Sequence, residues 1–234
     1  MARFARWAEQ VARIDAAVFR YINHTRLRSK GFDRFMYAFT QLGEGWIVLV
    51  PLTAVNYLTA LGGPWYPQAL SILLAAGVIC QVIKRCCPKT RPAGRLDSIH
   101  VVGRRLTAGS FPSGHTATSF GLAVILSHHA PAYSPLFFLA AFLIGWTRMY
   151  IGAHFPFDVL FGCIIGLTSS FGVLTWFELS PALGIANPLK AIFFATLATA
   201  LTLPLFGKYS FADMVDSFNG EARHILAVIR KWFQ

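Results

Sequence analysis

Apolar runs separated by short polar or Pro/Gly-containing breaks make up most of the chain after residue 43. Six of these runs approach ~20 residues, the length that crosses a bilayer as a helix. They cover residues 44–61, 67–84, 114–129, 135–150, 157–178 and 189–206. Several are short, so we expect tilt or local thinning of the bilayer. The pattern predicts an all-α fold, an integral membrane helical bundle of about six spans.

A different pattern precedes the first span. Six apolar or aromatic side chains recur at alternating spacings of three and four residues: Phe4, Trp7, Val11, Ile14, Val18 and Tyr21. Arginines repeat every seven residues on another side, at Arg6, Arg13 and Arg20. This predicts an N-terminal basic amphipathic helix. Its apolar stripe either lies in the headgroup region or packs on the spans, and we favour the headgroup region.

Residues 217–233 carry a weaker version of the same pattern. The chain shows no internal repeat and no linker that would divide it. We therefore expect one membrane domain over residues 1–234. Within it, 1–43 is the amphipathic N-terminal segment, 44–206 the six-span core and 207–234 an amphipathic C-terminal tail.

Composition agrees with a membrane protein, since 55% of the residues are hydrophobic and 13% are charged. These values exclude a disordered chain and argue against a soluble enzyme. The net charge of +11 would suggest nucleic acid in a soluble domain. In a membrane protein it indicates anionic lipid, a phosphate-bearing substrate or a topology signal. We therefore expect membrane lipids as partners and no nucleic acid.

In the six-span arrangement every Lys and Arg except Lys190 falls on one side of the membrane. The positive-inside rule makes that side cytoplasmic. Neither a zinc site nor a disulfide framework is suggested by the cysteines at 80, 86, 87 and 163. Unpaired Cys86 and Cys87 on the same side also favour a reducing compartment. The N-terminus lacks the pattern of a cleaved signal peptide.

Two clusters of candidate chemistry precede the third span. Lys84 ends the second span, and Arg91 follows it by seven positions, directly before Pro92. Cations at a span end commonly reach for the interface and the helix C-terminus, so this pair alone has an ordinary structural explanation. Ser113 and Gly114 open the third span, where free backbone N–H groups favour an anion.

Ser113 also suits an ordinary N-cap, but capping does not require the histidine that follows at position 115. His115 can give or take a proton near neutral pH beside such an anion.

A third cluster joins the fourth and fifth spans. It contains Arg148, His154 and Asp158, with Pro156 suited to the first turn of the fifth span. Asp158 would then accept the Nδ1 proton of His154 and leave Nε2 free for attack. A single His and Asp in a polar turn is usually unremarkable.

The six-span arrangement brings the three clusters to the same membrane face, which changes that assessment. Cations, backbone donors, two histidines and one carboxylate together suit a phosphoryl oxyanion. No acidic cluster resembles a magnesium site, so we expect neither metal nor cofactor. The residues predict phosphoryl transfer through a phosphohistidine without metal.

These segments resemble the three-part signature of the type 2 phosphatidic acid phosphatase family, which shares its site with vanadium haloperoxidases and bacterial acid phosphatases. Lys84, Arg91 and Pro92 match the first motif, and residues 112–115 match its Pro-Ser-Gly-His in full. Arg148, His154 and Asp158 match the third motif, with Thr147 in place of its serine. That replacement keeps a hydroxyl.

The resemblance implies a role for each matched residue. His154 would attack phosphorus with support from Asp158, His115 would protonate the leaving oxygen, and water would then hydrolyse the phosphohistidine. The phosphate would be held by Lys84, Arg91, Ser113, Gly114 and Arg148. It also implies a metal-independent lipid phosphatase acting on polyprenyl pyrophosphate, phosphatidylglycerophosphate, phosphatidic acid or lipid A phosphates.

Two other functions fit parts of the pattern. A lipid-to-lipid phosphotransferase would use the same phosphohistidine, and a non-catalytic anionic-lipid-binding protein would explain the charge without the histidines. The expected location is a bacterial inner membrane. The resemblance favours an outward-facing site there, whereas the basic residues favour a cytoplasmic one.

Overall fold

A computed structural model describes residues 2–59 and 63–202 of the protein. Regular structure in these ranges is helical and contains no strands, which confirms the predicted all-α class. The elements are α1 (Ala2–Asn23), α2 (Lys30–Thr40), the 3₁₀ helix η1 (Gln41–Gly43), α3 (Gly45–Thr59), α4 (Trp65–Cys86), α5 (Pro92–Arg95), α6 (Gly114–His129), η2 (Pro131–Tyr133), α7 (Ser134–Tyr150), α8 (Pro156–Leu179) and α9 (Pro188–Thr202). The predicted C-terminal tail and the end of the sixth predicted span lie outside the described residues.

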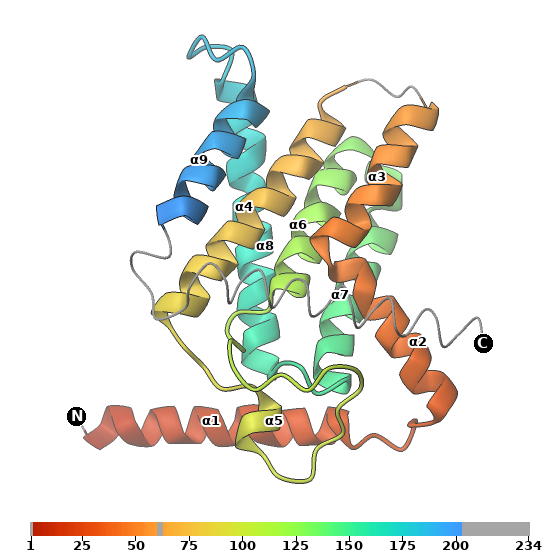
Figure 1. The fold of residues 1–234 in the computed structure, drawn as a ribbon, viewed down its shortest axis with the longest axis vertical. Helices are drawn as coiled ribbons and strands as arrows, with labels where there is room; N and C mark the ends of the chain where they lie inside the picture. Colours follow the sequence, from red (N-terminus) through yellow and green to blue (C-terminus); the bar gives the residue numbers. More distant parts are fainter. Residues whose placement is uncertain (1, 60–62, 203–234) are drawn as a thin grey trace.

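Six helices, α3, α4, α6, α7, α8 and α9, form a bundle, and each coincides with one of the predicted apolar runs (Figure 1). The main core contains Ile72 of α4, Ala117 of α6 and Val173 of α8. Glycines let α6 and α8 approach closely, because a Cβ on Gly166 would lie 2.4 Å from the Ala117 carbonyl oxygen. Such backbone proximity is typical of packing between membrane helices.

Membrane crossing is supported by length and apolar composition for α4 and α8. A third span results if Lys30–Gly43 and Gly45–Leu58, which are bent by 71°, count as one. Helices α6 and α7 have 16 and 17 residues. They are therefore about 24 to 26 Å long and cross a ~30 Å hydrocarbon core only where the bilayer thins. The count of six spans stays a prediction.

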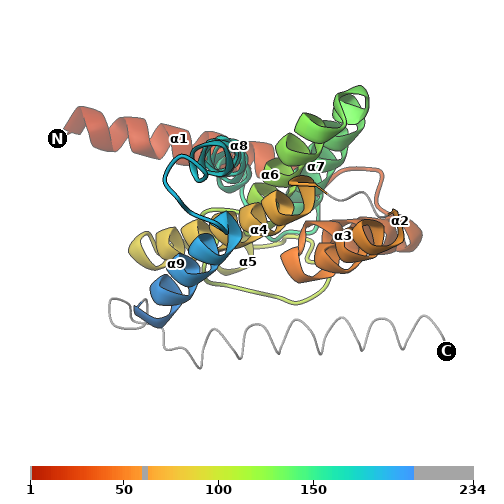
Figure 2. The same ribbon diagram turned by 90° about the horizontal axis from the view of Figure 1, so that it is seen from above.

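Helix α1 lies across one end of the bundle rather than along it (Figures 1 and 2). Asp15, Phe19, Ile22 and Asn23 are its buried side chains against that end. The Asn23 amide Nδ2 donates to the carbonyl oxygens of His100 and Tyr150, both at 2.9 Å. These contacts fasten α1 to the loop after α5 and to the end of α7.

The apolar stripe predicted for this helix does not face the bundle. Trp7, Ile14, Val18 and Tyr21 are 61%, 53%, 42% and 83% exposed. At 3.6 residues per turn they lie about 120° around α1 from the docked side. For these four residues, packing on the spans is therefore not observed. Their placement in the headgroup region stays a prediction.

The segment between α4 and α6 covers the same end of the bundle (Figure 1). Its two halves are joined because Arg91 N–H donates to the Thr107 carbonyl at 2.7 Å. Gly152, in the turn between α7 and α8, has φ +81°, and a Cβ there would lie 2.5 Å from the His100 carbonyl oxygen. Glycine therefore suits both the turn's conformation and its close approach to the loop.

Candidate active site

All eight predicted site residues lie at the end of the bundle that α1 crosses. Lys84 is in the last turn of α4, and Arg91 caps α5. Ser113, Gly114 and His115 form the start of α6. Arg148 is in the last turn of α7, and His154 and Asp158 flank the start of α8. The three motifs thus meet in space.

His154 is 2% exposed, and each of its ring nitrogens has a defined neighbour. Nδ1 lies 2.6 Å from the Ser110 carbonyl oxygen, and Nε2 lies 3.4 Å from Nη1 of Arg91. A carbonyl only accepts, so the proton is on Nδ1 and the Nε2 lone pair is available. Burial, followed by the charge of Arg91, holds the pKa of His154 well below its ordinary value. The imidazole is therefore neutral, as a nucleophile must be.

Asp158 does not contact His154 in the expected way. Its Oδ2 is 3.9 Å from Nδ1, beyond hydrogen-bonding distance. That oxygen instead accepts from the Ser110 hydroxyl at 2.5 Å and from the Phe155 backbone N–H at 2.9 Å. Asp158 is at the third position of α8, where a carboxylate is drawn to the free N–H groups of the helix start. Ser110 therefore lies between the two residues, with its hydroxyl on Asp158 and its carbonyl on Nδ1 of His154.

Two further residues fix this carboxylate. Lys89 Nζ lies 2.7 Å from Oδ1 of Asp158 and 3.3 Å from Oδ2 of Asp15 on α1. Oδ1 of Asp15 accepts the backbone N–H of Phe157 at 2.9 Å. Asp15 thus contacts the start of α8 directly and Asp158 through Lys89. Burial raises the pKa of Asp15 despite these donors.

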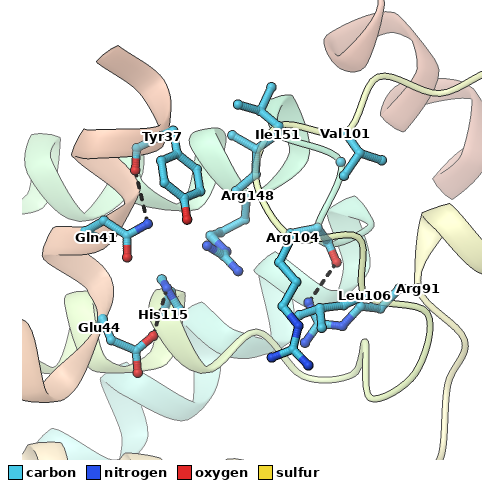
Figure 3. A pocket seen from close by; sticks show the side chains of 13 residues that line it. Tyr37, Gln41, Glu44, Arg91, Val101, Arg104, Leu106, His115, Arg148 and Ile151 are labelled. Carbon is cyan, nitrogen blue, oxygen red and sulfur yellow. Dashed lines mark hydrogen bonds and ion pairs between the residues drawn. The ribbon is translucent and has the colours of Figure 1, made fainter. Parts of the chain in front are cut away.

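A pocket lies at this end of the bundle (Figure 3), and its lining includes Gly152 and Ala153 of the turn before His154 but not His154 itself. Three predicted residues line it: Arg91, His115 and Arg148. Nε2 of His115 lies 3.1 Å from Oε2 of Glu44, which also lines the pocket. Arg104 adds a further guanidinium to the lining. The pocket is thus strongly cationic.

The three predicted cations each donate a hydrogen bond to the surrounding chain. Lys84 Nζ donates to the Gly109 carbonyl at 2.9 Å, and Arg91 Nε donates to that of Ala108 at 2.8 Å. Both cations therefore bind backbone carbonyls of the loop segment that leads to Ser110. Arg148 Nη1 donates to Oγ1 of Thr40 at 3.0 Å.

Ser113 acts as the N-cap of α6, with its Oγ accepting from the N–H and the hydroxyl of Thr116 at 3.5 and 2.8 Å. The next residue, Gly114, has open space where a Cβ would be. A Cβ on Gly162 of α8 would lie 2.5 Å from the Ser113 carbonyl oxygen. Close packing of α8 therefore positions the start of α6.

Five residues of this site were not predicted from the motifs: Asp15, Glu44, Lys89, Arg104 and Ser110. Two signals could have helped. Lys89 lies inside the first motif, two positions before Arg91, and Ser110 stands two positions before the second motif. Asp15 and Glu44 are carboxylates in a chain with only 10 Asp and Glu residues. Neither signal indicates the partner, because Asp15 and Asp158 are separated by most of the chain.

Comparison with known proteins identifies this arrangement. The family model described as PAP2 superfamily matches residues 65–181. A lipid A 4'-phosphatase from Bacteroides thetaiotaomicron is 32% identical over 68% of this chain and 74% of its own length. The crystal structure of LpxE from Aquifex aeolicus superposes with a TM-score of 0.63 and 31% identity over 70% of this chain and 96% of that one.

The Bacillus subtilis phosphatidylglycerolphosphate phosphatase structure, described as transmembrane and PAP2-type, shares the fold. It has a TM-score of 0.57 and 24% identity, covering 72% of this chain and 87% of that one. The family match includes every residue of the three motifs, from Lys84 to Asp158. The resemblance drawn from the motifs is confirmed: the chain belongs to the PAP2 superfamily and is a membrane lipid phosphatase.

Proposed function

We propose that the protein hydrolyses a lipid phosphate through a phosphohistidine formed on Nε2 of His154, without a metal ion. One observation carries the proposal. The hydrogen bond from Nδ1 to the Ser110 carbonyl leaves the Nε2 lone pair 3.4 Å from Nη1 of Arg91, a residue that lines the cationic pocket. A buried neutral imidazole with a fixed tautomer is prepared to attack phosphorus.

In the first step Nε2 forms a bond to phosphorus as the bond to the lipid oxygen breaks. His115 supplies a proton to that oxygen. Water then attacks the phosphohistidine, the P–N bond breaks, and inorganic phosphate leaves. Arg91 and Arg148 are placed to offset the charge that develops on the phosphoryl oxygens, with Lys84 behind them. Gly114 would contribute its backbone N–H at the start of α6. The Ser113 N–H is already donated to the Asp158 carbonyl at 2.9 Å, so Ser113 would act by fixing the start of the helix.

We favour a phosphorylated glycolipid of the lipid A type among the four predicted substrate classes. Support comes from the 32% identical relative that is named a lipid A 4'-phosphatase. Arg104 adds a guanidinium to those of Arg91 and Arg148 around the pocket. This exceeds what one phosphate dianion requires and suits a substrate with a second anionic group.

The test uses purified protein in detergent with lipid A, phosphatidylglycerophosphate, phosphatidic acid and a polyprenyl pyrophosphate, with and without chelator and vanadate. We expect phosphate release that survives the chelator, is inhibited by vanadate and is fastest with lipid A. A strict metal requirement would overturn the mechanism. A different preferred lipid would overturn only the substrate assignment.

Replacing the nucleophile separates catalysis from lipid binding. His154→Ala should lower phosphate release by roughly 10⁴-fold or more, as loss of a nucleophile does in other hydrolases. It should also abolish the acid-labile ³²P label on the protein. His128→Ala is the control, because His128 is exposed in the last turn of α6, away from the site. Substantial activity in His154→Ala would refute the assignment.

The same labelled lipid distinguishes hydrolysis from transfer. A hydrolase releases ³²P as orthophosphate, whereas a phosphotransferase places it on a second lipid. A protein that only binds anionic lipid gives neither product.

We further propose that the protein lies in a bacterial inner membrane with its site on the cytoplasmic side and α1 in the headgroup region. The exposed stripe of α1 supports the last point, with Arg6, Arg13 and Arg20 exposed on another side of the helix. The charge distribution predicted from sequence supports the orientation.

A further inference from the structure

A carboxylate from outside the matched family region contacts the proposed general acid. Oε2 of Glu44 lies 3.1 Å from Nε2 of His115, and the two side chains are 23% and 15% exposed (Figure 3). Glu44 joins η1 to α3, whereas the family match begins at residue 65. Neither the motifs nor the family match therefore assigns it a role.

The turn that carries Glu44 is attached to the helix of His115. The Thr118 hydroxyl, one turn further along α6, donates to the Gly43 carbonyl at 2.7 Å. A Cβ on Gly43 would lie 2.9 Å from the Cβ of His115. Glycine lets the turn close against the histidine, so the Glu44 contact is part of the packing and not a chance pair of surface side chains.

His115 faces an environment that opposes a positive charge. The charged or titratable groups around it, besides Glu44, are Lys84 from α4, Arg91 from the start of α5, Arg148 from α7, His154 before α8, and the pocket-lining Tyr37 and Arg104. Most are cations, and a general acid must hold a proton among them. The Glu44 carboxylate supplies the opposite charge at hydrogen-bonding distance.

We propose that Glu44 is a positioning residue that holds a proton on Nε2 of His115 and leaves Nδ1 as the nitrogen that exchanges a proton with the substrate. This rests on the proposed function, in which His115 is the general acid. The arrangement gives His115 a supporting carboxylate, as the serine hydrolase triad gives its histidine.

The proton balance is closed over one turnover. Nδ1–H protonates the lipid oxygen as its bond to phosphorus breaks. His115 becomes neutral, with its remaining proton on Nε2 and hydrogen-bonded to Glu44. Nδ1 then takes a proton from the attacking water as the P–N bond of the phosphohistidine breaks. His115 returns to its charged form, and no further reactant is needed.

The test compares Glu44→Gln with wild type on two substrates. For a lipid phosphate, whose leaving oxygen needs a proton, kcat should fall about 10- to 100-fold. For 4-nitrophenyl phosphate, whose leaving group departs as an anion, kcat should fall less than about threefold. Adding Glu44→Gln to His115→Ala should cause no further loss, because both changes remove the same function. Glu178→Gln, an exposed carboxylate in the last turn of α8, is the control.

A glycine pair tests the same contact without touching a titratable group. Gly43→Ala should reproduce the selective loss on lipid phosphate, because its methyl group would lie 2.9 Å from the His115 Cβ and 2.7 Å from Cγ2 of Ile144 and would push the turn from both. Gly45→Ala is the matched control, since a Cβ there meets only Leu73 at 3.9 Å. Equal loss on both substrates in Glu44→Gln and Gly43→Ala would show a structural role and overturn the proposal.

A measurement without turnover keeps this inference separate from the proposed function. Diethyl pyrocarbonate modifies neutral histidine, so the pH at which His115 becomes reactive reports loss of its proton. Glu44→Gln should move this midpoint down by about one pH unit or more. The alkaline limb of kcat/KM for the lipid should move the same way. An unchanged midpoint in Glu44→Gln would overturn the role of Glu44. Absence of phosphate release from the wild-type protein would overturn the proposed function alone.

Discussion

His154 is a buried neutral base, and this has a cost in stability at acid pH. In the unfolded chain its pKa is ~6.5. Because the folded pKa lies well below this, only the unfolded state binds a proton between the two values. Stability should therefore fall as pH decreases through ~6.5, until the folded pKa is reached. Thermal unfolding in detergent from pH 8 to 5 measures this dependence.

A His154→Gln variant should lose part of that pH dependence, since glutamine does not titrate but can still donate to the Ser110 carbonyl. The exposed His128→Gln is its control and should keep the wild-type slope. If His154→Gln unfolds with an unchanged pH dependence, the histidine is not buried in its neutral form.

Ser110 contacts both residues: its hydroxyl donates to Asp158, and its carbonyl accepts from His154. The hydroxyl can therefore be removed without removing the carbonyl. Ser110→Ala keeps the carbonyl and removes only the hydroxyl, so we expect kcat to fall about tenfold and stability by about 1–3 kcal/mol. Asp158→Ala should cost more activity. Ser127→Ala is a control, because the buried Ser127 hydroxyl has no hydrogen-bond partner among the described residues. Equal losses for Ser110→Ala and Asp158→Ala would contradict this ordering.

Sequence reasoning identified the residues that carry charge in a recognisable spacing, His154 and Asp158 among them, and the structure brings them together. It did not identify the contacts between them. The acceptor for Nδ1 is a backbone carbonyl, which every residue has, so no side-chain pattern marks Ser110. Glu44 reaches its site only through the packing of η1 on α6, which periodicity along one segment does not encode.

Among the elements, the six bundle helices were predictable because each is a long apolar run. Helices α2 and α5 were not. Residues 30–40 lie in the segment assigned as amphipathic, where Ser29 begins α2 by accepting the Phe32 N–H at 3.1 Å. Four residues of α5 are too few to show a period. The bend of 71° between α2–η1 and α3 is also invisible in an apolar profile.

The close packing of α6 against α8 depends on glycine. Two glycines of α8, Gly162 at this contact and Gly172 away from it, form a matched pair to test this. Gly162→Ala would place a methyl group 2.5 Å from the Ser113 carbonyl oxygen. We expect it to destabilise the protein by about 1–3 kcal/mol and to reduce activity by displacing the start of α6. Gly172→Ala, with nothing within 4 Å, should be neutral or stabilising by up to ~1 kcal/mol.

Thermal unfolding and phosphate release measure both variants. Similar behaviour of Gly162→Ala and Gly172→Ala would contradict the role of this close packing.

For the whole molecule, two exposed thiols can report which side of the membrane the site faces. Cys86 and Cys87 follow Lys84 at the catalytic end. With that end in the cytoplasm, an impermeant maleimide should label them only after cells are opened. A Cys86→Ser/Cys87→Ser variant controls for Cys80 and Cys163. Labelling in intact cells would place the site outside, as the family resemblance favours.

Helix α1 lies across the end of the bundle but outside the region that the family model matches. The matched region and the candidate site are therefore not the same set of residues. The segment that the family model matches, residues 65–181, holds all three motifs. It omits Asp15 against the start of α8, Thr40 against Arg148 and Glu44 beside His115. Grafting that segment into another scaffold would transfer every signature residue and none of these three supports. In this protein the candidate site therefore extends beyond the region that the family model matches.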